Sequence, residues 1–206
     1  MKVLLINGSP HEKGCTYTAL SLIAGELKAQ GIETEILHVG GQPVGGCIGC
    51  GGCRSGNGCV FGGVVNEAIE KAKTADAFVF GSPVHYASAA GNMASFMDRL
   101  AYAGGKYLAY KPAAICASAR RAGTTTTLDQ LVKYPEFFHM PLVSGSYWPM
   151  VHGSKPEQVL EDEEGCAVMR ELGRNMAWLL KCIELGKANG IIHPENPRCP
   201  MTNFIR

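Results

Sequence analysis

The chain has 206 residues, of which 46% are hydrophobic and 18% charged, enough to bury one substantial core without disulfide bonds. Its formal net charge is +1 at pH 7 and no long basic or acidic block occurs, so neither nucleic acid nor an anionic membrane is expected as a partner. No apolar run reaches the roughly 18 residues that span a bilayer, and the apolar segment 3–6 is too short for a signal peptide. We therefore expect a cytoplasmic protein whose thiols stay reduced.

Short apolar runs alternate with helical patterns along the chain. The patterns predict strands at 2–6, 32–39, 77–81, 111–118 and 141–145. They predict helices at 15–30, 64–73, 89–101, 124–133 and 157–187, the last one broken near Gly165 or Gly173. The segment 40–63 combines many glycines with four cysteines and is predicted to be irregular. We assign residues 1–187 to a single domain and residues 188–206 to an extended C-terminal tail, expected to wrap a neighbouring subunit.

Strands that alternate with helices and are apolar on both faces are typical of a doubly wound parallel sheet. We predict an α/β fold, a flavodoxin-like five-stranded parallel sheet in the order 2-1-3-4-5, with a cysteine-rich loop after strand two. Loops that follow parallel strands emerge at one edge of the sheet, and ligands bind there. We therefore expect five loops to converge, at residues 7–15, 40–63, 82–89, 118–124 and 146–156.

The segment from Asn7 to Thr18 joins the first strand to the first helix. A helix start offers unpaired backbone N–H groups that suit a phosphate, and the loop matches neither a Walker A sequence nor the GxGxxG fingerprint. Its hydroxyls, without a lysine at the Walker A position for a γ-phosphate, suit a monophosphate such as that of FMN. The alternative is an ordinary strand–helix turn with a Ser/Thr cap. The candidate contacts are Ser9, His11, Gly14, Cys15, Thr16 and Thr18.

Two further loops carry groups that suit a planar heterocycle. The segment 82–86, Ser-Pro-Val-His-Tyr, offers two aromatic side chains after a buried strand. The alternatives are a Tyr86 that caps the core and a solvated His85. The segment 117–124 offers small residues and two arginines, Arg120 and Arg121, which would offset charge on reduced flavin or face NADPH, a neighbouring subunit or water. Asp98 and Arg99 lie on a predicted helix, where we expect an internal or intersubunit ion pair and not a catalytic role.

These segments resemble the NADPH-dependent FMN reductase branch of the flavodoxin-like superfamily over roughly residues 1–150. The matching pieces are 3–10 (Val-Leu-Leu-Ile-Asn-Gly-Ser-Pro), 81–86 (Gly-Ser-Pro-Val-His-Tyr) and 91–99, which ends in Phe-Met-Asp-Arg. Where the family usually has Gly-Asn-Thr, this chain has Gly14-Cys15-Thr16, which removes one side-chain amide from the expected phosphate contacts.

The resemblance implies a specific set of FMN contacts. Ser9, Thr16 and Thr18 would hold the phosphate. Five consecutive residues would line the isoalloxazine ring, namely Pro83, Val84, His85, Tyr86 and Ala87. The segment 118–123 would close the other side, with Ser118, Arg120, Arg121 and Gly123 as its candidate contacts. NAD(P)H is the electron donor that the family name implies.

Four of the nine cysteines lie close together, at Cys47, Cys50, Cys53 and Cys59. Thiolates at such short spacing, wrapped by glycines, suit the corners of a [4Fe–4S] cube. The spacing resembles the compact motif of the iron–sulfur flavoproteins, although here Phe-Gly-Gly follows soon after the last cysteine. Two alternatives stay open. The first is a zinc site, because zinc accepts four thiolates, although usually from two separated Cys-x-x-Cys pairs. The second is that the cysteines hold no metal and are either free or oxidised.

The sequence thus predicts an FMN-dependent oxidoreductase that takes electrons from NAD(P)H or a reduced carrier and passes them through a [4Fe–4S] cluster to an acceptor. One alternative is a cluster-free NAD(P)H-dependent FMN or quinone reductase. A second is a non-enzymatic FMN electron carrier or redox sensor, and a third is a zinc-stabilised module without flavin. The expected partners are small-molecule or protein electron donors and acceptors. The expected assembly is a homodimer or homotetramer, with 147–149 after the last strand in the subunit interface.

Overall fold

The computed structural model describes residues 1–195 and 202–203. Its β-strands are β1 (Lys2–Asn7), β2 (Glu33–His38), β3 (Ala77–His85), β4 (Ser88–Ala89), β5 (Ala113–Ala119) and β6 (Met150–His152). Its α-helices are α1 (Cys15–Ala29), α2 (Val64–Thr74), α3 (Gly91–Gly104), α4 (Thr124–Phe137), α5 (Pro156–Glu161) and α6 (Glu163–Ala188). Two short 3₁₀ helices, η1 (Gly52–Ser55) and η2 (Gly105–Tyr107), complete the described elements.

The sheet confirms the predicted flavodoxin-like topology. Its order is β2-β1-β3-β5-β6, and all four of these neighbouring pairs are parallel. Counting only the parallel strands, this is the expected order 2-1-3-4-5. The sheet has six strands and not five, because β4 pairs with the end of β3 in an antiparallel hairpin.

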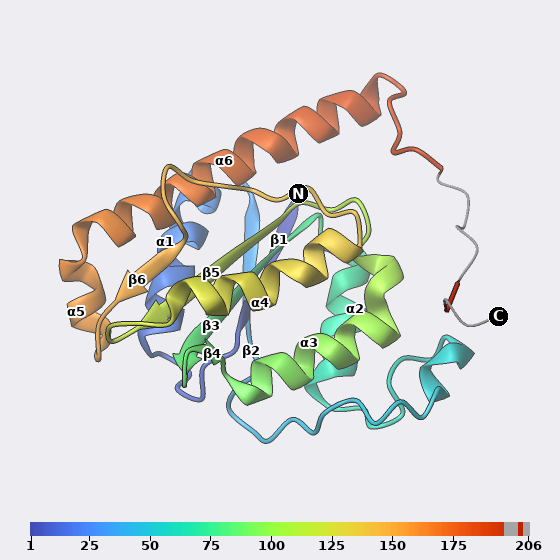
Figure 1. The fold of residues 1–206 in the computed structure, drawn as a ribbon. Helices are drawn as coiled ribbons and strands as arrows, with labels where there is room; N and C mark the ends of the chain where they lie inside the picture. The colour runs from blue at the N-terminus through green and yellow to red at the C-terminus, as the bar shows by residue number, and fades with distance from the viewer. Residues whose placement is uncertain (196–201, 204–206) are drawn as a thin grey trace.

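Helices cover both faces of the sheet (Figure 1). On one face α1 and α6 pack together over a core that includes Leu5, Leu20 and Met169. On the other face α2, α3 and α4 cover a core that includes Phe80, Phe96 and Leu131. Strands buried on both sides explain why the apolar runs of β1, β3 and β5 are nearly continuous. Among the described residues, no helix has the length and apolar content needed to cross a membrane.

The last strand differs from the prediction. We expected a strand at 141–145 and a loop at 146–156, but only an isolated bridge joins Leu142 to Ala113, and the paired strand β6 is Met150–His152. The chain leaves the sheet between these two points. The aromatic pair Tyr147 and Trp148 therefore precedes β6 at the side of the sheet and does not follow the last strand at the carboxyl edge.

The long C-terminal helical stretch is interrupted at Asp162, three residues before Gly165, so the expected break near Gly165 is confirmed and none occurs at Gly173. Asp162 caps α6 by accepting a hydrogen bond from the amide of Gly165 at 2.9 Å, and Glu163 and Glu164 occupy the first turn, where negative charge is favourable. Helix α6 ends at Ala188, close to the expected domain boundary. The predicted interface role of the proline-rich tail falls mostly on 196–206, including Cys199, outside the described residues except 202–203.

Candidate functional site

The loop between β1 and α1 is fixed by its own hydrogen bonds. Asn7 is fully buried, and its side chain accepts from the amide of Ser9 at 3.1 Å and donates to the carbonyl of Glu12 at 2.9 Å. Ser9 is also buried, and its Oγ accepts from the amide of His11 at 3.1 Å. The side chain of His11 is exposed. This loop therefore has one defined shape before any ligand binds.

The start of α1 leaves three backbone amides, those of residues 15–17, ahead of the first helical hydrogen bond from Thr18 to Gly14. Gly14 provides no side-chain cap. An uncapped start of a 15-residue helix suits an anion, because the free N–H groups and the helix dipole both favour negative charge. The Thr18 hydroxyl donates to the carbonyl of Gly14 at 3.3 Å. The alternative of a Ser/Thr-capped turn is thus wrong for this helix.

Neighbouring loops meet this first loop directly. Thr16 Oγ1 and Ser118 Oγ lie 2.8 Å apart, and both residues are buried. His38 Nε2, at the end of β2, lies 2.8 Å from the carbonyl oxygen of Ser9. Cys15 Sγ donates to the carbonyl of Gly153, after β6, at 3.4 Å. The ends of β1, β2, β5 and β6 therefore converge as the topology predicted.

Burial also sets the state of the Cys15 thiol. Desolvation raises its pKa above the usual value, because the charged thiolate is disfavoured away from water. The raised pKa favours the neutral thiol of Cys15 at the helix start and does not favour an activated nucleophile.

The second predicted flavin loop is partly a hairpin. Strand β3 continues through Pro83 and Val84, both half-buried, to an exposed His85, and the chain turns back into β4. Tyr86 and Ala87 form the turn with φ values of 50° and 58°, a left-handed conformation that costs non-glycine residues roughly 1–2 kcal/mol each. The Tyr86 side chain is fully exposed, so it does not cap the core.

Helix α4 holds this hairpin in place. The hydroxyl of Thr126 donates to the carbonyl of Ala87 at 2.7 Å. Gln130 Oε1 accepts from the amide of Ala89 at 2.9 Å and from the hydroxyl of Ser88 at 2.6 Å. The strained turn is therefore held by two side chains of α4, because strained backbone persists only where the surrounding structure supports it.

The loop after β5 lies beside the hairpin. Gly123 has a φ of 92°, and a Cβ there would lie 2.6 Å from the Cα of Ala87. Only glycine permits both this conformation and this approach. Arg120 and Arg121 are exposed. The structure thus brings Ser118 into contact with the first loop and leaves both arginines at the surface.

The four clustered cysteines line one cavity of about 310 Å³, which also includes Arg99 and Tyr102 in its walls. Cys47 and Cys50 are exposed, and Cys53 and Cys59 are partly buried. Within residues 1–195 and 202–203, no three His, Cys, Asp or Glu side chains are grouped closely enough to hold a single metal ion. The four sulfur atoms therefore line the wall of the cavity and do not converge on a single metal position.

Arg99, on α3, reaches into this cavity and is only 7% exposed. Its Nε donates to Cys59 Sγ at 3.3 Å, and its two terminal nitrogens donate to the carbonyls of Gly62 and Gly45 at 2.9 and 3.4 Å. Its guanidinium also lies 5.7 Å from the centre of the Phe61 ring. None of the described carboxylates pairs with it.

Neither Asp98 nor Arg99 forms an ion pair within the described residues, so the internal ion pair is not seen, while an intersubunit one stays a prediction. Asp98 instead accepts a hydrogen bond from the hydroxyl of Tyr134 at 2.6 Å. Besides Arg99, Asn66 also contacts Cys59. The Asn66 side chain accepts a hydrogen bond from the Cys59 amide at 2.8 Å and donates one to the Cys59 carbonyl at 3.0 Å. Arg99 and Asn66 are site residues that the sequence did not identify, since neither has a local pattern that marks it.

A parallel α/β sheet with a hydrogen-bonded loop and an uncapped helix start at its carboxyl edge, and a separate thiol-lined cavity, is typical of a flavodoxin-like redox protein. Residues 1–155 match the NADPH-dependent FMN reductase family. An iron–sulfur flavoprotein of Methanocaldococcus jannaschii is 30% identical over 193 residues, which cover 89% of this chain and all of the relative. One of Archaeoglobus fulgidus is 31% identical over 80% of this chain and 83% of its own length. The chain belongs to the NADPH-dependent FMN reductase family, in its iron–sulfur flavoprotein subgroup, and is an oxidoreductase.

Solved structures agree on the fold. RosB bound to a formylated riboflavin phosphate intermediate is similar with a TM-score of 0.71 at 12% identity, over all of this chain and 92% of that protein. The apo form of the NADH:FMN oxidoreductase EmoB has a TM-score of 0.61 at 18% identity, over 88% of this chain and 89% of that one. At these identities the similarity establishes the flavodoxin-like fold alone.

Proposed function

We propose that this protein is an iron–sulfur flavoprotein that accepts electrons from NAD(P)H or a reduced carrier onto FMN and passes them on through a [4Fe–4S] cluster. The observation that carries the proposal is the cysteine cavity: four thiols and a buried, unpaired guanidinium enclose the same volume of about 310 Å³. A buried cation is costly without a counter-charge. Four thiolates that hold a cluster would supply that negative charge.

The flavin site follows from the carboxyl edge. The free amides at the start of α1 would bind the FMN phosphate, with Ser9, Thr16 and Thr18 beside them. The hairpin 83–87 and the segment 118–123 would flank the isoalloxazine ring. Because the hydroxyls of Thr16 and Ser118 already bond to each other, the backbone donors are the main phosphate contacts in this proposal.

When bound, FMN accepts a pair of electrons and releases them singly, while an iron–sulfur cluster carries one at a time. The residues of this chain bind and orient both groups. The fixed phosphate loop places one end of the flavin, and Arg99 and Asn66 fix the position of Cys59. A cytoplasmic location belongs to this proposal, because cluster ligation needs reduced thiols.

The rim of the cysteine cavity favours a homo-oligomer. Four apolar side chains around it are 55–74% exposed, namely Ile48, Val60, Phe61 and Tyr102. Tyr102 lies on α3, and the other three lie in the loop between β2 and α2, which in Figure 1 extends beside α3, away from the carboxyl ends of the strands. Clustered apolar exposure marks interaction surfaces. A dimer or tetramer in which this rim meets a second copy would exclude water from the cluster and bring it towards a flavin.

An anaerobic visible spectrum combined with iron and sulfide analysis tests both cofactors. We expect flavin bands together with about four irons and four sulfides per chain. Flavin without iron would indicate a cluster-free FMN or quinone reductase. Zinc in place of iron would indicate a structural zinc site with four thiolate ligands. A protein that binds no FMN would refute the proposal. Stopped-flow mixing with NADPH and with NADH then separates a reductase, whose flavin bleaches, from a carrier that a nicotinamide does not reduce.

A further inference from the structure

The edge of the sheet beside β5 is interrupted in its middle. The amide of Ala113 donates to the carbonyl of Pro141 at 2.9 Å, and Val143 donates back to Ala113 at 2.8 Å. The chain then leaves the sheet and returns at Pro149, whose carbonyl accepts from Ala117 at 2.9 Å. The residues between Val143 and Pro149 therefore bypass the part of β5 that lies between Ala113 and Ala117.

This bypass leaves the N–H and C=O groups of Ile115 without a hydrogen-bond partner among the described residues on the outer side of β5. Alternate residues of a strand point their N–H and C=O groups to the same side, so Ile115 faces the gap just as Ala113 and Ala117 face their partners. No residue that the structure describes hydrogen-bonds to the amide or carbonyl of Ile115 across the gap. Ile115 is only 6% exposed. Unpaired backbone groups at such burial are rare in folded proteins and costly.

Side chains of α6 hold the bypass away from β5. Asn175 donates to the carbonyl of Ser144 at 2.9 Å. Glu171 Oε2 accepts from the amide and the hydroxyl of Ser146 at 2.9 and 2.7 Å. The same hydrogen bonds lower the pKa of the Glu171 carboxyl, with that from the Ser146 amide contributing most. The gap is thus fixed by specific contacts on the far side of the loop.

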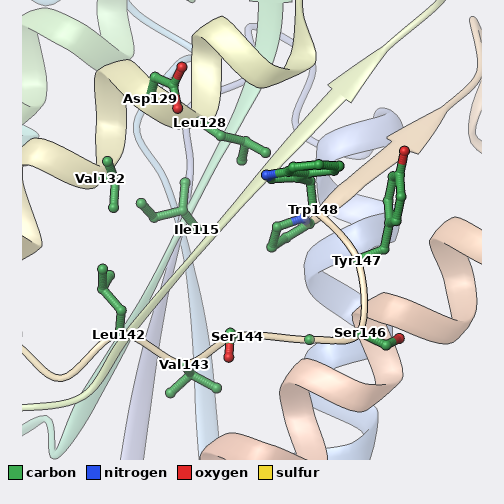
Figure 2. Close-up of a pocket in the computed structure, with 12 residues that line it drawn as sticks. Ile115, Leu128, Asp129, Val132, Leu142, Val143, Ser144, Ser146, Tyr147 and Trp148 are labelled. Atoms are coloured by element: carbon green, nitrogen blue, oxygen red, sulfur yellow. The ribbon is translucent and has the colours of Figure 1, made fainter.

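The gap opens into a cavity of about 430 Å³ between the bypass and α4, within the range of small-molecule sites. Its walls are Ile115, Leu128, Val132 and Leu142, with the carboxylate of Asp129 at the rim. Figure 2 shows the indole of Trp148 extending from the loop towards Leu128 and Ile115 with its nitrogen end foremost. The cavity therefore combines an aromatic wall, an aliphatic wall and a backbone donor–acceptor pair.

We propose that this cavity binds a planar heteroaromatic lactam, a ring of the pyrimidinedione or pteridinedione class. The adjacent C=O and N–H of such a ring match the N–H and C=O that Ile115 presents side by side, and the ring stacks on the indole of Trp148. An extended peptide does not fit this role, because the chain itself occupies the strand positions on both sides of the gap, at Val143 and Pro149.

This site is separate from the proposed flavin crevice. Ile115 precedes Ala119, the last residue of β5, by four residues, which at about 3.3 Å per residue is roughly 13 Å. The inference does not rest on the proposed function, since it uses only the sheet edge, α4 and the bypass. Its failure would leave iron and FMN content unchanged.

The test is a titration of the FMN-saturated protein with lumazine (pteridine-2,4-dione), followed by tryptophan fluorescence. The chain has two tryptophans, so the variant Trp178→Phe makes Trp148 the sole reporter. We expect saturable quenching at one lumazine per chain. 1,3-Dimethyllumazine, which lacks both N–H donors, is expected to bind at least ten-fold more weakly. Val132→Phe, which fills the cavity, is expected to weaken lumazine binding at least ten-fold, whereas the exposed neighbour change Lys133→Ala leaves it unchanged.

Several outcomes would overturn the inference. These are an absence of saturable quenching, equal affinity for the dimethylated ring, and binding that Val132→Phe leaves intact, which would place lumazine outside this cavity. Dissociation of an oligomer by Val132→Phe without any lumazine binding would assign the cavity to a subunit contact. Bound FMN and far-ultraviolet circular dichroism check that Val132→Phe folds, and Leu142→Phe, at the cavity wall, replaces it if it does not.

Discussion

Replacing Arg99 with glutamine is expected to act differently on the empty and on the cluster-loaded protein. The Arg99 guanidinium is 7% exposed and bonds to two carbonyls and the sulfur of Cys59, with no carboxylate among its partners. In the empty protein, removing it relieves a desolvated charge while losing these hydrogen bonds, so the free energy of unfolding changes by about 1 kcal/mol or less. In the loaded protein the same change leaves buried negative charge unpaired, which costs roughly 3–5 kcal/mol.

The reduction potential gives a second measure of the same charge. Reduction adds one negative charge to the cluster, and a unit positive charge about 6 Å away at an effective dielectric constant of about 20 stabilises it by roughly 2.8 kcal/mol. For a one-electron couple this corresponds to roughly 120 mV. We therefore expect Arg99→Gln to lower the potential by about 120 mV, measured by a redox titration that is followed by electron paramagnetic resonance.

Arg54 provides the matched control, because it lines the same cavity but is exposed. Solvent screens an exposed charge, so Arg54→Gln should shift the potential by less than about 30 mV and leave iron retention unchanged. Equal shifts in the two variants would refute the reasoning. An equal loss of unfolding free energy in the empty and the cluster-loaded Arg99 variant would also refute it, because a purely structural role of Arg99 predicts equal losses.

Three further predictions concern the two sites. Gly40→Ala should weaken FMN binding more than ten-fold by fluorescence titration, because its Cβ would clash with the backbone of the phosphate loop, whereas Gly45→Ala, with open space around it, should not. Cys15 should react with iodoacetamide at pH 8 more slowly than a free thiol does, because its raised pKa lowers the fraction of reactive thiolate. Mass spectrometry measures the rate, and an equal rate would contradict the prediction. Cys53→Ser should lose iron but keep FMN, while the exposed Cys182→Ser should keep both.

The parallel strand order could be predicted from the sequence because strands buried on both faces have continuous apolar runs, as β1 and β3 do. The split of the last strand could not. The apolar residues of 141–145 have strand character, but Ser144 and Ser146 are held by side chains of α6. Those contacts join segments about thirty residues apart in the sequence. No local pattern records them.

The candidate site shows the same division. The anion-binding character of the first loop follows from local rules, since a glycine-rich turn and an uncapped helix start are adjacent in the sequence. Arg99 was expected to form an internal or intersubunit ion pair, whereas its contacts depend on α3 packing against the cysteine loop. A buried arginine is recognisable only when the surrounding fold shows which counter-charge it lacks.

The two proposed cofactor sites are prepared to different extents by the chain. The phosphate loop is fixed by the buried Asn7 and by the contact of His38 with Ser9, so flavin binding needs little reorganisation and loses little conformational entropy. The cysteine loop, in contrast, is rich in glycine, and Gly51 and Gly56 flank η1 in the left-handed region. Binding energy of a cluster would have to order such a loop, as it does in metal-dependent folds. We therefore infer that FMN binds to the cluster-free chain, whereas stable cysteine-loop structure depends on the cluster.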